Sequence, residues 1–321
     1  MDFREKFLIS FLSKRAKNKL KLTSVPSDIF FDLSDKFSIR LGHYPASHYP
    51  KVTAESDHFI GGEVMNLSFH TKGVILEEKS FRKQLLLANH LLDTFRISTI
   101  SVIMSKPTLS ASAWKFMQMV NQRQLSIKSF YYEAGASPEF VGKILDECTE
   151  VTDKVGIVAW FPYAYLYTPF RPFKTTNLRI NGNFNWSNLE SFMNFGYVSI
   201  QFWENPTRTA QFYKSFFTKW MDSNARLQRL EFCIEKAEHQ LIMNALRKQG
   251  IQQNIADEWI RMERKNGIEF FIKSIPYCII IYTKQAYLDY LKEIEQRALA
   301  RGLAINLRLD EHPINFVEPM F

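Results

Sequence analysis

From about residue 98 the chain alternates two kinds of segment, and this alternation constrains the fold more than any other feature. Short runs rich in β-branched and aromatic residues are each followed by a stretch of helical periodicity. The runs are Ser98–Met104, Ile127–Glu133, Val155–Phe161, Asn177–Asn181, Tyr197–Trp203 and Leu227–Ile234. Parallel strands need long connections, usually helices, so this order predicts a parallel sheet in an α/β fold.

The helical stretches carry apolar side chains at a spacing of three or four residues. After Ser137-Pro138-Glu139, a typical start of a helix, Phe140, Ile144 and Cys148 follow one another at intervals of four. Phe212, Phe216 and Trp220 repeat the pattern. Each set makes one apolar stripe, which predicts a helix packed against the sheet.

The spacing of the strands and the C-terminal pattern together define the expected fold class. Strand centres lie roughly 21 to 31 residues apart, close to the period of leucine-rich-repeat solenoids. The segment Trp259–Ile272 contains two extended runs around Asn266-Gly267, which predicts a β-hairpin. A further strand at Cys278–Thr283 and a last helix around Tyr287–Ala298 follow. We therefore expect a leucine-rich-repeat-like curved repeat of strands and helices with a C-terminal hairpin and helix.

The region before the repeat contains weaker signals. Ile29–Leu33 and Phe37–Leu41 are typical of short antiparallel strands, and Phe81–Leu92 has helical periodicity. With 46% hydrophobic and 23% charged residues and only 12 glycines and 12 prolines in 321 residues, extensive disorder is excluded.

Charge and hydropathy bear on partners and location. The net charge of +8 is dispersed, apart from the basic cluster Lys14–Lys21. Aromatic residues fall on apolar helix positions and do not form a base-stacking platform, so nucleic acid is not an expected partner. Met1–Lys6 and the short apolar run after it do not fit a secretory signal, and Val155–Phe170 is too short for a membrane span. We expect an intracellular protein, cytoplasmic or nuclear, without membrane contact.

The sequence shows none of the common catalytic, nucleotide-binding or metal-binding motifs. Cys148, Cys233 and Cys278 lie far apart in the chain, which favours buried thiols over a disulfide framework or a zinc site. His43, His48 and His58 lack the spacing of metal ligands, and Glu235 and Glu238 fit the start of a helix better than an acid pair. We expect no enzyme activity, no cofactor and no metal.

Three stretches resemble a known family. Phe7–Lys17 is similar to the last helix of nematode-type F-boxes, which usually ends in an apolar segment followed by SKRAK. Phe216–Glu231 resembles the "FLKhWi.gsNprLeyLei" signature of the F-box associated domain, type 2. Ile260–Gly267 resembles the "dI.ReDG" element of the same domain, with Lys265-Asn266 in place of Glu-Asp.

The resemblance implies a division of the chain and a function. The resemblance implies that residues 1–22 are the remnant of a truncated F-box, because the opening helix of an F-box has no counterpart before Phe7. Residues 23–174 would form the N-terminal strands and the strand–helix repeat. Residues 175–321 would form the F-box associated domain, type 2, and the C-terminal helix. The resemblance also implies a substrate-recognition subunit of an SCF-type ubiquitin ligase. The alternative is a stand-alone protein-binding repeat protein without ligase recruitment.

Two sets of residues are candidates for partner contacts. Phe7, Leu8, Phe11 and Leu12 would form the surface facing the SCF adaptor, which a truncated F-box would bind weakly; the alternative for Phe7–Lys21 is a short amphipathic lead-in helix. Alternation along strands turns Val198, Ile200, Leu230 and Phe232 toward the helices. The opposite face would then present a target-binding surface for a protein whose identity the sequence does not give: Trp203, Gln201, Arg179, Arg229 and Glu231.

Overall fold

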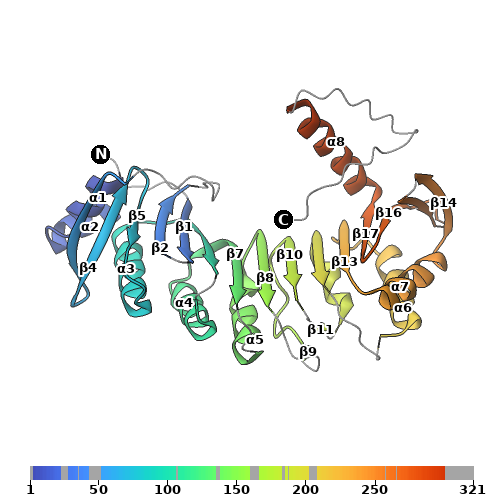
Figure 1. Ribbon diagram of the computed structural model, residues 1–321, viewed down its shortest axis with the longest axis horizontal. Coiled ribbons are helices and arrows are strands. Elements are labelled where there is room, and N and C mark those ends of the chain that lie inside the picture. The colour runs from blue at the N-terminus through green and yellow to red at the C-terminus, as the bar shows by residue number, and fades with distance from the viewer. Residues whose placement is uncertain are drawn as a thin grey trace. The chain divides into compact units, whose positions relative to one another are not determined.

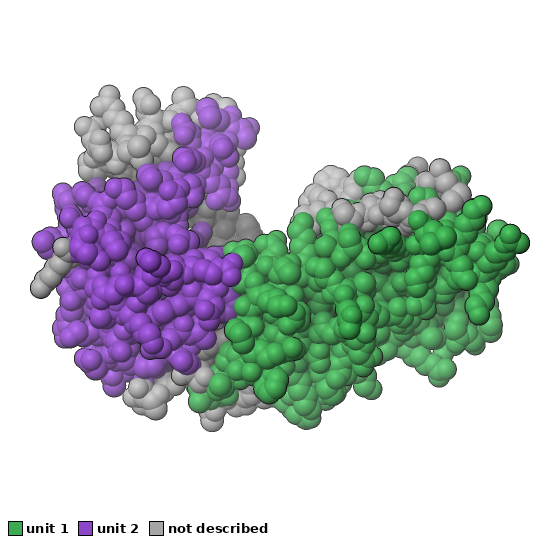
Figure 2. Space-filling model, turned by 180° about the vertical axis from the view of Figure 1, so that it is seen from behind, with its two compact units in different colours: residues 1–179 green, residues 180–321 purple. Residues whose placement is uncertain are grey.

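The structure is a computed structural model (Figure 1). It describes residues 3–22, 28–34, 36–42, 52–105, 108–134, 138–159, 166–182, 185–186, 188–201, 208–256, 258–264 and 266–300. The chain divides into two compact units, residues 1–179 (unit 1) and 180–321 (unit 2), which are coloured separately in Figure 2. Each unit is described by itself.

Unit 1 is built on an open sheet with the strand order β8-β7-β6-β1-β2-β5-β4-β3. Its elements in chain order are α1 (Phe3–Ile9), α2 (Lys14–Lys21), β1 (Asp28–Leu33), β2 (Phe37–Leu41), β3 (Ala54–Ile60), β4 (Glu63–His70), β5 (Gly73–Leu76), α3 (Phe81–Thr94), β6 (Thr99–Met104), α4 (Ser110–Gln122), β7 (Ser126–Ala134), α5 (Pro138–Glu147), the short 3-10 helix η1 (Cys148–Glu150), β8 (Lys154–Ala159) and β9 (Leu166–Tyr167). The boundary between the units falls inside β10 (Asn177–Asn181).

The parallel part of this sheet confirms the predicted alternation of strands and helices. β1, β6, β7 and β8 pair in parallel, with Thr99 opposite Ser126 and Ser129 opposite Lys154. The helix α4 connects β6 to β7 and α5 connects β7 to β8. Phe31 of β1 lies against Phe116 of α4, with ring centroids 5.4 Å apart, so the helices bury one face of the sheet.

The antiparallel part of unit 1 was not fully expected from the sequence. The β1–β2 hairpin is confirmed, with Phe31 opposite Ile39. The meander of β3, β4 and β5 was missed, although Gly61 and Gly62, both at positive φ, form the two-residue connection between β3 and β4. A Gly-Gly pair between extended runs is a hairpin signal, and it was obscured by the charged, mostly exposed β3.

The N-terminal segment forms two helices that pack into unit 1. α1 ends at Ile9 and α2 begins at Lys14, where the hydroxyl of Ser13 accepts a hydrogen bond from the backbone N–H of Ala16 at 3.0 Å. A single helix over Phe7–Lys21 is therefore wrong, because this N-cap starts a new helix. The basic end of α2 is exposed except at Leu20, which is buried.

Two histidines of unit 1 are held in surroundings that favour the neutral ring. His70 is buried, and in the described part of the chain neither of its ring nitrogens has a hydrogen-bond partner. His90 lies parallel to the ring of Phe11 at 4.7 Å, and its Nε2 is 2.8 Å from the hydroxyl of Ser10. Burial, reinforced by Arg40 and Lys17 respectively, lowers the pKa of each imidazole to about 4.

We expect these histidines to make unit 1 less stable in mild acid. The unfolded chain takes up protons near pH 6.5 and the folded chain only near pH 4, so stability is complete above 6.5 and falls as the pH drops through this window. Urea midpoints should therefore be lower at pH 5 than at pH 7.5, and His70→Gln with His90→Gln should flatten the difference. A midpoint that rises on acidification would contradict the assignment.

Unit 2 carries an open sheet in the order β14-β15-β16-β17-β13-β12-β10. Its elements after β10 are β11 (Asn185–Trp186), the 3-10 helix η2 (Leu189–Asn194), β12 (Tyr197–Gln201), α6 (Ala210–Met221), β13 (Arg229–Cys233), α7 (Lys236–Arg247), β14 (Ile251–Ala256), β15 (Trp259–Glu263), β16 (Glu269–Ile275), β17 (Cys278–Thr283) and α8 (Lys284–Ala300). The predicted hairpin corresponds to β15 and β16, and β17 has the predicted bounds; β14 was not predicted.

The sheet of unit 2 is covered from two sides. Phe232 of β13 lies against Tyr213 and Phe217 of α6, with centroids 6.2 and 6.5 Å apart. On the opposite face of the sheet, Tyr282 of β17 belongs to an apolar cluster with Tyr287 of α8. Figure 1 shows α8 extending from these strands away from α6 and α7. The helix predicted over 212–220 is confirmed, with Thr209 capping α6; of its predicted stripe, Phe216 and Trp220 are buried and Phe212 is half-buried.

The described residues thus form a mixed α/β fold with open sheets and several helices, as the sequence predicted at this level. Among the described residues, the helices fall short of the length and apolar character that a membrane crossing requires.

Candidate functional site

The most distinctive polar group of unit 2 lies on the sheet face opposite α6 and α7. It comprises Tyr197 of β12, Arg229 and Glu231 of β13, and Tyr282 of β17, here called the Tyr–Arg platform. Arg229 is the register partner of Tyr197 on one side and of Tyr282 on the other. Neighbouring residues in register point to the same face, so the three strands place these side chains together.

The guanidinium of Arg229 lies between two tyrosine rings. Its Cζ is 4.8 Å from the ring centroid of Tyr197 and 5.1 Å from that of Tyr282, within the range of cation–π attraction. Its Nη2 also donates to Oε2 of Glu231 at 3.1 Å, and the hydroxyl of Tyr197 donates to the same oxygen at 2.8 Å. The platform is therefore ordered within the chain before any partner binds.

The platform combines fixed geometry with partial access to solvent. The side chain of Arg229 is 30% exposed and that of Glu231 18%. Burial, followed by the charge of Glu231, raises the pKa of the Tyr197 hydroxyl to about 12. Burial also raises the pKa of Tyr282. Both tyrosines stay protonated at neutral pH. The Tyr197 hydroxyl donates to Glu231, whereas Tyr282 is 1% exposed and contacts Arg229 from within the apolar cluster that includes α8.

The alternation expected for β10 and β13 is confirmed, whereas in β12 Ser199, on the side of the strand expected to face outward, is also buried. Leu178, Ile180, Val198, Ile200, Leu230 and Phe232 are fully buried. Of the predicted target-binding residues, Arg229 and Glu231 lie together, and Gln201 is half-buried, with its Oε1 accepting from the N–H of Gly182 at 3.2 Å. Arg179 is exposed and is the last residue of unit 1. Trp203 lies outside the described residues.

Sequence reasoning missed three side chains of this face. Tyr197 could have been found from the sequence, because it precedes Gln201 by four residues on the same strand. An even spacing along a strand places two side chains on the same face of the sheet. Tyr282 and Cys278 could not, since their approach to β13 depends on β17 pairing with that strand. The three cysteines are far apart in the sequence, but two of them are neighbours in the structure, because Cys233 is the register partner of Cys278. Cys148 is buried in unit 1.

The predicted adaptor-facing residues have different environments. Phe7 is 0% exposed, and its ring packs against Phe69 and His90 of unit 1 at 5.8 and 5.7 Å. Phe7 therefore belongs to the core of unit 1, and its assignment to an adaptor-facing surface is corrected. Leu8 and Phe11 are half-buried, and only Leu12, 77% exposed, is fully open to a partner.

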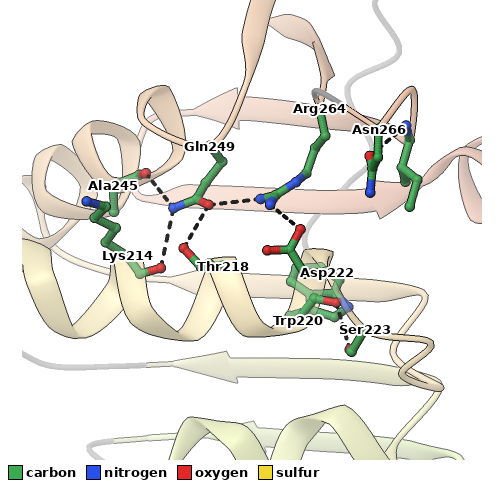
Figure 3. A network of polar contacts seen from close by, with 10 residues as sticks. Lys214, Thr218, Trp220, Asp222, Ser223, Ala245, Gln249, Arg264 and Asn266 are labelled. Carbon is green, nitrogen blue, oxygen red and sulfur yellow. Dashed lines mark hydrogen bonds and ion pairs between the residues drawn. The ribbon is translucent and has the colours of Figure 1, made fainter.

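Polar contacts join the segment Phe216–Glu231 to the hairpin segment Ile260–Gly267 (Figure 3). Arg264 donates from Nη1 to Oε1 of Gln249 at 2.9 Å, and its Nη2 pairs with Asp222. Gln249 also accepts from the hydroxyl of Thr218 at 3.0 Å. The Gln249 amide nitrogen in turn donates to the carbonyls of Lys214 and Ala245. Asp222 directly follows α6 and Arg264 directly follows β15, so both segments contribute to the stability of unit 2.

A buried ion pair lies at the contact between α6 and α7. Glu238 pairs with Arg208 at 3.3 Å and accepts a hydrogen bond from the hydroxyl of Tyr213. The side chains of both charged residues are almost fully buried. Breaking such a pair leaves a buried charge, so its role is structural. Glu238 does begin a helix, as predicted, but its carboxylate serves this pair.

Comparisons of the chain with protein-family models, with curated proteins and with solved structures found no match.

Proposed function

We propose that the chain is a protein-interaction module that acts by binding and not by catalysis. The single observation that carries this proposal is the Tyr–Arg platform. Arginine and tyrosine are enriched among the residues that dominate binding energy at protein interfaces. Because Arg229 is already held between two rings and by Glu231, a partner would meet a rigid surface and would lose little side-chain entropy on ordering it.

The proposed target-binding surface keeps most of the residues named from the sequence. In unit 2 these are Gln201, Arg229 and Glu231, next to Tyr197, with Trp203 following β12 in sequence; the buried Tyr282 supports Arg229 and does not face the target. Arg179, the remaining residue named from the sequence, is the last residue of unit 1 and is not part of this proposed surface. The partner is a protein, since the face combines aromatic rings with charges of both signs.

Two finer proposals concern the fold and the role. The parallel order of β1, β6, β7 and β8 with intervening helices supports a leucine-rich-repeat-like curved arrangement. The resemblance of Phe216–Glu231 and Ile260–Gly267 to the F-box associated domain supports an intracellular substrate-recognition subunit of an SCF-type ubiquitin ligase. In that role the chain would hold a target for a ubiquitin-charged enzyme.

One observation favours the alternative of a stand-alone binding protein. Phe7, the first apolar residue of the F-box-like segment, contributes to the core of unit 1 and is not available to an adaptor. Titration calorimetry with the purified SCF adaptor separates the two roles. Binding that weakens on Leu12→Asp supports the ligase role, and no measurable binding supports the stand-alone role.

Target binding itself is tested by comparing proteins captured by four versions of the full chain. Wild type and the exposed control Ile251→Ala should capture the same proteins, whereas Gln201→Ala and Trp203→Ala should lose at least one of them. Arg229→Ala is unsuitable alone, because removing the guanidinium also disrupts the contacts of Tyr197 and Glu231. Identical capture by all four versions would contradict the proposed surface.

A further inference from the structure

Three metal-ligating side chains converge beside the Tyr–Arg platform. Glu231 and Cys233 are two residues apart on β13 and point to the same face, and Cys278 of β17 is the register partner of Cys233. The carboxylate oxygen and the two sulfur atoms all lie within 4.8 Å of one another. Neither thiol is in a disulfide, and all three side chains are half-buried.

The distances suit a small tetrahedral cation. With metal–sulfur bonds of about 2.3 Å and metal–oxygen bonds of about 2.0 Å, tetrahedral ligands lie about 3.5 to 3.8 Å apart. Sγ of Cys233 is 3.9 Å from Oε1 of Glu231. This pair therefore needs a change of only a few tenths of an ångström to reach the separation of tetrahedral ligands, and the sulfur of Cys278 lies within 4.8 Å of both atoms.

The surroundings of Glu231 resemble the outer shell of a metal site. Tyr197 and Arg229 both donate to Oε2, which leaves Oε1 directed toward Cys233. Hydrogen bonds of this kind fix the orientation of a metal-binding carboxylate. Two thiolates and one carboxylate carry three negative charges, which a divalent cation and the guanidinium of Arg229 together balance.

We propose that Glu231, Cys233 and Cys278 bind a single Zn²⁺ ion, leaving one coordination position to water. Two thiolates select a soft or borderline metal over Mg²⁺ or Ca²⁺, and a set of sulfur and oxygen ligands in tetrahedral arrangement favours zinc. The ion would cross-link β13 to β17 at the end of the platform. This inference does not depend on the proposed target binding.

The test uses the reduced full chain titrated with Cd²⁺, whose bonds to thiolate give an ultraviolet charge-transfer band, and then with Zn²⁺ in competition. We expect one equivalent of Cd²⁺ per chain, displaced by Zn²⁺. The band should persist in Cys148→Ser, since that thiol lies in unit 1, and disappear in Cys233→Ser and Cys278→Ser. Tyr197→Phe should weaken binding by about tenfold or more.

Each variant is first checked for folding by its melting temperature without metal, and Zn²⁺ should raise that temperature only where the site is intact. Glu231→Gln retains both thiols and the shape of the side chain, so weaker binding in this variant reports the loss of the carboxylate. The proposal is overturned if the wild type shows no band, if Cys148→Ser loses it, or if Glu231→Gln binds as tightly as the wild type. The proposal is also overturned if Cys233 and Cys278 form a disulfide in the purified protein and the reduced protein then binds no Cd²⁺.

Discussion

Replacing Trp220 by alanine is expected to lower the free energy of unfolding by about 3–5 kcal/mol. The indole is 2% exposed and lies 6.0 Å from the ring of Phe216 and 5.6 Å from that of Phe270. Its N–H donates to the carbonyl of Leu227 at 3.0 Å, which joins α6 to the start of β13. Alanine would remove these contacts and leave a cavity between helix and sheet. Urea unfolding followed by circular dichroism measures the change.

Two control variants separate the contributions at this position. Trp220→Phe retains most of the apolar volume but leaves the Leu227 carbonyl without the indole, so its cost should be about 1–3 kcal/mol. Ile251→Ala, at a side chain of unit 2 that is 80% exposed, should change stability by less than about 0.5 kcal/mol. Equal midpoints for Trp220→Ala and Ile251→Ala would show that the packing of α6 is incorrectly described.

Replacing Phe7 by alanine is expected to destabilise unit 1 by about 3–5 kcal/mol. The ring is fully buried and packs against Phe11, against Phe69 on β4 and against His90 on α3. The loss should appear as faster amide hydrogen exchange in β4 and α3, because these elements lose their shared contact. Unit 2 serves as an internal reference in the same experiment.

Leu12→Ala is the matched control, since Leu12 lies in the same segment but is largely exposed. It should leave exchange in unit 1 unchanged. If Phe7→Ala left exchange unchanged and instead reduced binding of the SCF adaptor, Phe7 would belong to a partner surface and its place in the core would be wrong.

The local pattern of the sequence was sufficient to predict most of the repeat. Runs of β-branched and aromatic residues predicted β6, β7, β8 and β17 within two residues of their bounds, and Asn266-Gly267 predicted the β15–β16 hairpin. Apolar spacing predicted α6 and its buried face. These features depend on residues close together in the chain, where periodicity and turn preference act directly.

Elements with weak local signals were missed for physical reasons. β3 has exposed, charged residues on much of its length because it is the last strand of its sheet in unit 1, so it lacks the apolar alternation of a half-buried strand. β14 occupies the corresponding place at the end of the sheet of unit 2, and its residues are half-buried or exposed.

The candidate site shows which information is local and which is not. Alternation along β13 determined from the sequence alone that Arg229, Glu231 and Cys233 share one face. Only the tertiary structure decided that Tyr282 and Cys278 join them, because β13 pairs with β17 and not with β14, the next strand in the chain. Likewise, Phe7 was identified as apolar from the sequence, but its burial depends on Phe69, which is far away in the chain. Side-chain direction follows from backbone geometry within a few residues, whereas the choice of a pairing strand or packing partner is made among distant segments that compete for the same apolar surface.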